Sequence, residues 1–187
     1  MANIIPSSII RRWPSKIWLV LFCGFTLIAP GYAKSQTAGT YHLAQCPNSA
    51  VTVSYQYRRD FDLTCSALNT LKLKMADLGY KTDINTTVRF QEHVEYRNFA
   101  DAPPMTVYGL YQRDIDHIQL SSWKSFSLFP GSRKVLGLPI DEILHHSVVI
   151  HELSHAFVYL NATSAIPSVG QEFWAYALQI ELLPAEY

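Results

Sequence analysis

The chain has 187 residues, of which 49% are hydrophobic and 16% are charged. A chain of this length and composition can form one domain with a buried core, and it is too apolar to be intrinsically disordered. Its 15 basic and 15 acidic side chains cancel at pH 7, so no overall field attracts nucleic acid, and we expect no nucleic-acid partner.

A secretory signal peptide is predicted at residues 1–33. Three basic side chains precede the apolar, uncharged run at residues 17–29, and small residues follow it up to Ala33. A basic segment, a short apolar segment and a small-residue cleavage site are the three parts of such a signal. The apolar run is short for a bilayer span, but an uncleaved membrane anchor is the alternative. We expect cleavage after Ala33, no membrane span afterwards, and a single secreted or periplasmic domain over residues 34–187.

Two cysteines follow the signal region, Cys46 and Cys65. An even number of cysteines in an exported protein usually indicates disulfide bonding. We predict a bridge between them, which would stabilise the fold by about 3 kcal/mol through closure of a loop of nineteen residues. Two buried free thiols are the alternative.

The first half of the exported domain alternates between strand and helix patterns. Residues 50–57 alternate as in a strand, and apolar residues then recur at helical spacing from about Asp62 to Leu78, where Gly79 is placed to end the helix. Three further strands are predicted at residues 86–96, 106–112 and 117–123, with a chain break at residues 101–104 and a turn at residues 113–116. The pattern predicts a small mixed sheet.

A long, largely buried helix is predicted at residues 140–160, which contain no glycine or interior proline. It carries the sequence HELSH, with His151, Glu152 and His155 in the HExxH pattern. Two histidines four residues apart project from one helix face, about 6 Å apart along the axis, so both can bind one zinc ion while the glutamate approaches water. The composition of the chain makes a chance match about one in a hundred. A hydrogen-bonded histidine pair in a helical interface is the alternative.

A catalytic zinc site usually has three protein ligands and one open position. Our choice for the third ligand is Glu172, in the first turn of a second helix predicted at residues 171–183, which can pack against the first. The alternative for Glu172 is a favourable interaction with the positive end of its own helix. Four other side chains are less suitable because of their place on the helices or after Pro184: His145, His146, Glu181 and Glu186.

HELSH followed after a loop by GQEFWAYALQ resembles the zincin metallopeptidases of the gluzincin type, in which a glutamate on the next helix completes the HExxH site. It also resembles small secreted bacterial zincin-like domains, and GLYQRDIDHIQLSS is similar to the edge-strand region that precedes their HExxH helix. The likeness covers about residues 51–183. It departs from thermolysin-like enzymes, which have an extended Asn-Glu segment around the third ligand, and it lacks an aminopeptidase exopeptidase motif.

The resemblance implies a minimal zincin-like α+β domain, with a small mixed sheet packed on the HExxH helix and on the following Glu-bearing helix. It implies that His151, His155 and Glu172 bind Zn²⁺ and that Glu152 is the catalytic general base and acid. We therefore expect a secreted zinc metallopeptidase whose activated water attacks a peptide bond of a peptide or protein substrate. A regulatory protein partner is compatible with the small size of the domain.

The alternative function is a non-catalytic, zincin-fold binding or interaction domain in the cell envelope, although a structural site has no use for Glu152. Tyr176, one turn after Glu172, could stabilise an oxyanion, but packing is the favoured role because aromatic residues surround it. The sequence leaves the roles of Tyr159 and His117 open.

Overall fold

The computed structural model describes residues 40–97, 103–128, 134–135 and 137–187. The described residues form one compact unit. The predicted signal peptide and its cleavage site at Ala33 lie outside the described residues. Among the described helices, none combines the length and the apolar character needed to cross a membrane.

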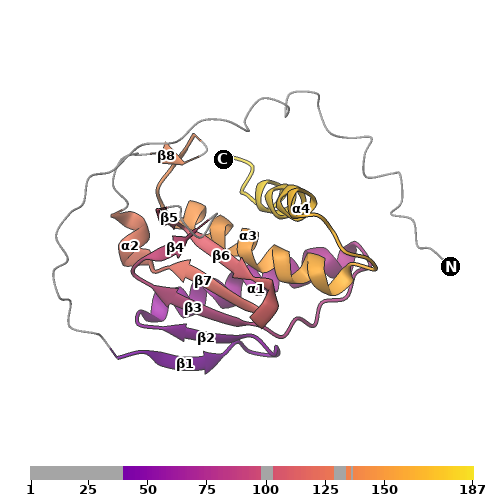
Figure 1. Ribbon diagram of the computed structural model, residues 1–187, viewed down its shortest axis with the longest axis horizontal. Helices are drawn as coiled ribbons and strands as arrows, with labels where there is room; N and C mark the ends of the chain where they lie inside the picture. The colour runs from indigo at the N-terminus through magenta and orange to yellow at the C-terminus, as the bar shows by residue number, and fades with distance from the viewer. Residues whose placement is uncertain (1–39, 98–102, 129–133, 136) are drawn as a thin grey trace. The chain divides into compact units, whose positions relative to one another are not determined.

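The main sheet has five strands, in the order β1-β2-β3-β7-β6 (Figure 1). Their bounds are β1 (His42–Gln45), β2 (Thr52–Tyr55), β3 (Thr87–Gln91), β7 (His117–Ser121) and β6 (Gly109–Gln112). The two inner pairs, β2–β3 and β3–β7, are parallel, whereas β1–β2 and β6–β7 are antiparallel. The sheet is therefore mixed, as predicted, and β6 lies at one of its edges.

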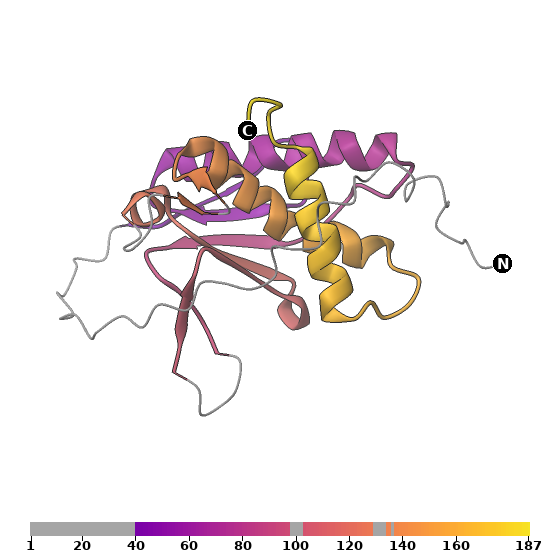
Figure 2. The same cartoon turned by 90° about the horizontal axis from the view of Figure 1, so that it is seen from above.

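In the described part of the chain, four α-helices accompany the sheet, α1 (Arg58–Asp77), α2 (Trp123–Ser127), α3 (Glu142–Asn161) and α4 (Ser168–Glu181), together with a short 3-10 helix, η3 (Arg113–Ile115). Helix α1 joins the parallel strands β2 and β3, and it lies beside α3, while α4 crosses α3 (Figure 2). Apolar side chains from α1, α3 and the sheet form one core, and its largest fully buried members include Leu71, Phe90, Ile118, Leu120, Leu153 and Phe157. The α+β class is confirmed at this level.

Two predicted strands are each divided in the structure. The strand predicted at residues 86–96 forms β3 and a separate β4 (Val94–Tyr96), and the one predicted at residues 106–112 forms β5 (Met105–Val107) and β6. Strands β4 and β5 pair with each other, outside the main sheet. Alternation continues through both runs, so the change of pairing partner leaves no mark in the periodicity.

Several short elements were not predicted, namely β1, α2, β8 (Lys134–Val135) and β9 (Leu138–Pro139). They are too short to show a clear hydrophobic period. Helix α1 begins at Arg58, earlier than the predicted start near Asp62. The apolar spacing used for the prediction did not include the first turn, because that turn is mostly polar. Its predicted end is confirmed, since Gly79 adopts a left-handed φ of 77° and its N–H donates to the carbonyl of Ala76.

The predicted disulfide is confirmed. Cys46 and Cys65 are bonded, with their Cα atoms 5.4 Å apart. Because Cys65 lies on α1 and Cys46 follows β1, the bond ties the first edge strand to the helix that packs on the sheet.

Candidate metal centre

Helix α3 places the HExxH residues in the interior of the domain. Its N-cap residue Asp141 accepts a hydrogen bond from the Leu144 N–H, at 2.9 Å. Nearly every position from Leu144 to Val158 is buried, as expected for a helix that is apolar on all sides. The motif side chains retain only 8% exposure at His151, 7% at Glu152 and 6% at His155.

Three side chains from α3 and α4 converge on one point. The Nε2 atom of His151 lies 3.4 Å from one carboxylate oxygen of Glu172, and Nε2 of His155 lies 3.6 Å from the other. One ligand atom from each of the three residues lies within 4.8 Å of the other two. Tetrahedral zinc with bonds of about 2.0–2.2 Å requires ligand atoms about 3.3–3.6 Å apart. The two separations from Glu172 lie close to this range, and the structure brings the three predicted ligands together.

The charge states of this cluster also suit a cation. Burial, with the neighbouring charge of His151, lowers the pKa of His155 to about 4, so its ring is neutral at pH 7. A hydrogen bond from His151 is the largest influence lowering the pKa of Glu172, which keeps that carboxyl ionised. Neutral imidazole and ionised carboxylate are the forms in which these groups bind metal.

Glu152 lies against the edge strand β6, where its stem contacts Gly109. A Cβ atom at position 109 would lie only 2.5 Å from both Cγ and Oε1 of Glu152, so a side chain there would displace the carboxylate. The carboxylate accepts a hydrogen bond from the backbone N–H of Tyr111. Glycine at position 109 thus allows β6 to hold Glu152 closely.

Burial raises the pKa of Glu152 to about 7 and is the largest influence on it. The negative charge of Glu172 raises the pKa further, whereas His151 and the Tyr111 N–H lower it. A carboxyl with a pKa near neutrality can both accept and return a proton at physiological pH. The free protein therefore carries a suitable general base beside the three ligand atoms.

Four residues that the sequence did not single out support these groups. The Tyr111 ring stacks on His155 with a centroid separation of 5.8 Å, and its hydroxyl donates to Asp116 at 3.3 Å. The Nδ1 atom of His151 lies 3.1 Å from Oε1 of Gln179, whose Nε2 donates to Ser147 at 3.0 Å. In the sequence, Gly109 and Tyr111 could have been noticed only as part of the GLYQ run, and Gln179 only because it lies two helical turns after Glu172.

Tyr176 lies at the cluster, with its ring centroid 4.4 Å from that of His151. The side chain is 44% exposed. Burial raises its pKa, and the charges of Glu172 and Glu152 raise it further. The hydroxyl therefore stays protonated and able to donate at neutral pH, while the ring packs on a ligand, so this geometry accommodates both roles considered for Tyr176.

The remaining candidate side chains lie elsewhere. His145 is buried against Phe126 with its Nε2 atom 3.0 Å from the Ser121 carbonyl oxygen, and burial lowers its pKa to about 4. The other members of this group stand on different surfaces: His117 on β7, half-buried His146 on α3, Tyr159 beneath Arg113, Glu181 in an ion pair with Lys74, and exposed Glu186. None of them is in the cluster of ligand atoms.

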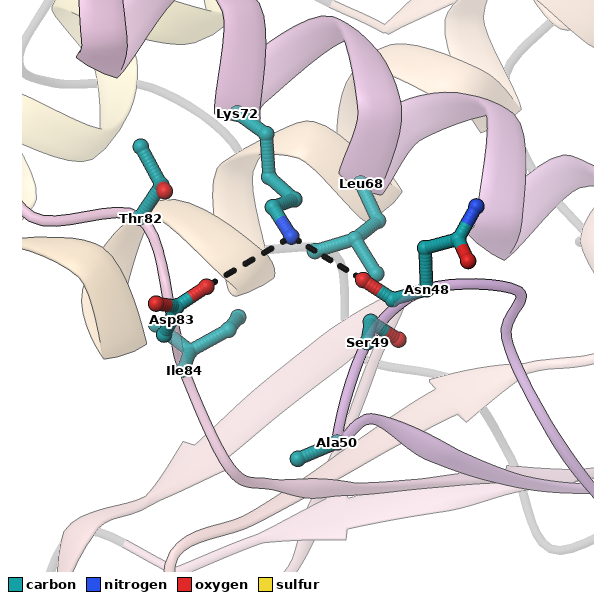
Figure 3. A pocket seen from close by; sticks show the side chains of 8 residues that line it. All are labelled: Asn48, Ser49, Ala50, Leu68, Lys72, Thr82, Asp83 and Ile84. Atoms are coloured by element: carbon teal, nitrogen blue, oxygen red, sulfur yellow. Dashed lines mark hydrogen bonds and ion pairs between the residues drawn. The ribbon is translucent and has the colours of Figure 1, made fainter.

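Two cavities flank the helices. One, of about 570 Å³, lies at the end of α3 and along the loop that leads to α4, where Tyr159, Ile166 and Gln171 are among its lining residues; the three converging side chains are not among them. The other, of about 300 Å³, lies between α1 and the β1–β2 turn and is called here the Lys72 hollow (Figure 3). The Lys72 ammonium group donates to the Asn48 carbonyl at 3.2 Å and lies 3.7 Å from the Asp83 carboxylate, as Figure 3 shows.

No curated protein and no solved structure matches this chain. One protein family, described as a family of unknown function (DUF6639), matches residues 51–187. The matched region begins beside β2 and includes all of α3, α4 and the three converging ligands. The chain therefore belongs to the DUF6639 family.

Proposed function

We propose that this protein is a zinc-dependent hydrolase with a zincin-like site, and that it acts as a secreted or periplasmic metallopeptidase. The observation that carries the proposal is the convergence of His151, His155 and Glu172 beside the buried carboxyl of Glu152. Structural zinc sites usually have four protein ligands, whereas catalytic sites have three and keep one position open. Three ligands next to a carboxyl with a pKa of about 7 support the catalytic kind.

Each residue has a chemical role under this proposal. When bound, zinc supplies Lewis acidity that makes water more acidic and a carbonyl more electrophilic. Glu152 accepts the proton from the attacking water and returns it to the leaving amine. Gly109 and the Tyr111 N–H hold the Glu152 carboxylate in place. Tyr176, whose ring contacts His151, is placed to donate a hydrogen bond to developing negative charge.

An extended peptide is the substrate class that the surroundings favour. In the main sheet, β6 pairs with β7 on one side only, and its other side faces Glu152. A peptide can add to such an edge through backbone hydrogen bonds.

A non-catalytic interaction domain is the second candidate, and the outer surface of α4 favours it. Four apolar side chains are exposed there at helical spacing: Val169, Phe173, Tyr176 and Ile180. A contiguous apolar patch is a common mark of protein–protein contact. It also fits the expected regulatory partner, which would then cover the helix that carries Glu172.

The test is the zinc content of the purified, dialysed protein, in the wild type and in Glu172→Ala and Glu152→Gln variants. We expect about one zinc per chain in the wild type, weaker retention in Glu172→Ala and full retention in Glu152→Gln. Glu181→Ala is the matched control, because Glu181 lies on the same helix but pairs with Lys74.

A library of internally quenched peptides then separates the two candidate functions. Cleavage by the zinc-loaded wild type, lost in Glu152→Gln, supports the peptidase. Zinc binding without any cleavage supports the interaction domain. No zinc in the wild type, even after reconstitution, overturns the metal site.

A further inference from the structure

We infer that Ser147 and Gln179 are positioning residues that fix the ring tautomer of His151, so that its Nε2 atom presents a lone pair to the metal. This inference rests on the proposed zinc site for its purpose, but the hydrogen bonds that support it are all between residues of this protein. They lead from Ser147 on α3 to Gln179 on α4, and from there back to His151 on α3.

The first step is the hydroxyl of Ser147. Its Oγ atom lies 2.8 Å from the carbonyl oxygen of Leu144, one turn earlier on α3. A carbonyl oxygen can only accept, and a hydroxyl has a single proton, so that proton is committed to Leu144. The Oγ atom is then left as an acceptor toward its second neighbour, the side-chain amide of Gln179 at 3.0 Å.

The second step is the orientation of the amide. Since Ser147 can only accept, the –NH₂ group of Gln179 must face it, and the amide oxygen must point the other way. That oxygen lies 3.1 Å from Nδ1 of His151. An amide oxygen only accepts, so Nδ1 carries a proton. In a neutral imidazole the other nitrogen, Nε2, then has the free lone pair.

The third step is the direction of that lone pair. Nε2 of His151 is the atom that lies 3.4 Å from the Glu172 carboxylate within the ligand cluster. The series of hydrogen bonds from Leu144 through Ser147 and Gln179 therefore selects the metal-binding tautomer of His151. All three side chains in it are at least nine-tenths buried, with exposures of 2% at Ser147, 4% at Gln179 and 8% at His151.

As a hydrogen-bond partner of His151, the neutral amide of Gln179 differs from a carboxylate. Metal-binding histidines commonly donate to a carboxylate or to a backbone carbonyl, both of which accept in any orientation. An amide accepts through one end only, so Gln179 needs Ser147 to set its direction. Ser147, which contacts no ligand atom, thereby acts on the metal site through two hydrogen bonds.

The test compares Ser147→Ala with Ser154→Ala, a matched control. Ser154 is also buried on α3, and its hydroxyl donates to the Ile150 carbonyl one turn earlier, at 2.7 Å, whereas the Gln179 amide donates to Ser147. Long-range ¹H–¹⁵N spectra of the imidazoles report the tautomer; they are recorded on the metal-free protein at pH 8 in a Glu172→Ala background, which removes the carboxylate that can accept a proton from Nε2. Competition with a chelator reports zinc affinity.

In that background we expect the parent and Ser154→Ala to show His151 protonated at Nδ1. Ser147→Ala should give a mixture of tautomers and a loss of zinc affinity of several-fold to about tenfold, and Gln179→Leu a loss of about 10- to 100-fold. Adding Gln179→Glu to Ser147→Ala should restore the single tautomer and the affinity, because a carboxylate needs no orienting partner.

Two results would overturn the inference: His151 protonated at Nε2 in the metal-free Glu172→Ala parent, or a Ser147→Ala protein that matches Ser154→Ala in both spectrum and zinc affinity. Failure of the proposed function looks different. An Nδ1 proton in the Glu172→Ala parent, together with a wild type that binds no zinc, keeps the hydrogen-bond series and rejects the metal site.

Discussion

The Lys72 hollow and the metal-ligand cluster are both polar, but they differ in how their polar groups are paired. In the hollow, the Lys72 ammonium bridges a backbone carbonyl and the Asp83 carboxylate, so its charge is satisfied within the chain. In the cluster, two imidazole nitrogens and a carboxylate converge on one another, and all three are metal-binding groups. The polar groups of the hollow are thus paired within the scaffold, whereas the cluster brings together three groups of the types that bind metal.

The two regions are also built from different parts of the fold. The hollow lies between α1 and the β1–β2 turn, close to the disulfide at Cys46. The cluster lies where α3, α4 and the edge strand β6 meet. Changes near the hollow should therefore affect the free energy of unfolding and leave zinc affinity unchanged. Changes at the cluster should affect zinc binding or the rate of hydrolysis more than the free energy of unfolding.

The largest effect is expected from Glu152→Gln. Removing the general base should lower the rate of peptide hydrolysis by about 10²- to 10⁴-fold, while zinc content stays at the wild-type value. Single-turnover cleavage of a peptide found in the library measures the rate. Glu142→Gln, at the exposed start of the same helix, is the control and should keep full activity. Equal rates for Glu152→Gln and wild type would remove Glu152 from the mechanism.

A loss of stability without a loss of zinc binding is expected from the double variant Cys46→Ala, Cys65→Ala. Opening a loop of 19 residues should lower the free energy of unfolding by about 3 kcal/mol. Urea denaturation at pH 7 measures the loss. Zinc affinity of the folded fraction should match the wild type, and a fall in that affinity would show that the two regions are coupled.

The comparison is sharpened by Asp60, a second buried carboxyl that lies far from any metal ligand in sequence. Burial raises its pKa from 3.8 to about 6, and only one of its oxygens has a partner, the Trp123 N–H at 3.0 Å. Between those two pH values the folded state binds more protons than the unfolded state, so this group lowers stability as pH rises.

Asp60→Asn should remove that decline. Relative to wild type, the variant should gain up to about 3 kcal/mol between pH 4 and pH 7, measured by urea unfolding at both values. Asp62→Asn is the control, because Asp62 is exposed and pairs with Arg58. A difference between Asp60→Asn and wild type that does not grow with pH would mean that the folded protein does not favour protonated Asp60.

The smallest effect is expected from Lys72→Met. The ion pair with Asp83 is long, at 3.7 Å, and the Asp83 side chain is 96% exposed. Such pairs contribute less than about 1 kcal/mol to the free energy of unfolding. Thermal and urea unfolding should change little, and zinc affinity should be the same as in wild type. A large loss of zinc would contradict the scaffold role of the hollow.

The side chains that lie together in the structure could be located from the sequence. His151 and His155 are four residues apart on one helix, so helical spacing brings them to one side, and Glu172 lies near the start of the next helix along the chain. Gly109 and Tyr111 could not be assigned in this way. Their role depends on β6 lying beside α3, a contact between residues some forty positions apart that no periodicity reports.

The fold shows the same division between local and distant information. The alternating runs located the strands, but the division of residues 86–96 into β3 and β4 depends on which strands pair. The roles of Ser147 and Gln179 likewise depend on how α4 crosses α3. Both side chains are polar and buried, and from sequence alone each reads as an ordinary surface residue of a helix.

Helix α4 carries one of the three converging side chains, and α3 carries the other two. Ala175, Ala177 and Leu178 are the buried apolar residues of α4, and its other attachments include the Gln179 hydrogen bonds and the Lys74–Glu181 ion pair. Opening of α4 away from α3 would therefore separate Glu172 from the two histidines. A zinc ion shared between α3 and α4 would oppose that opening by about 4 kcal/mol when free zinc exceeds its dissociation constant a thousandfold. Metal supply would then govern how readily proteases cut the α3–α4 loop, and so the lifetime of the protein.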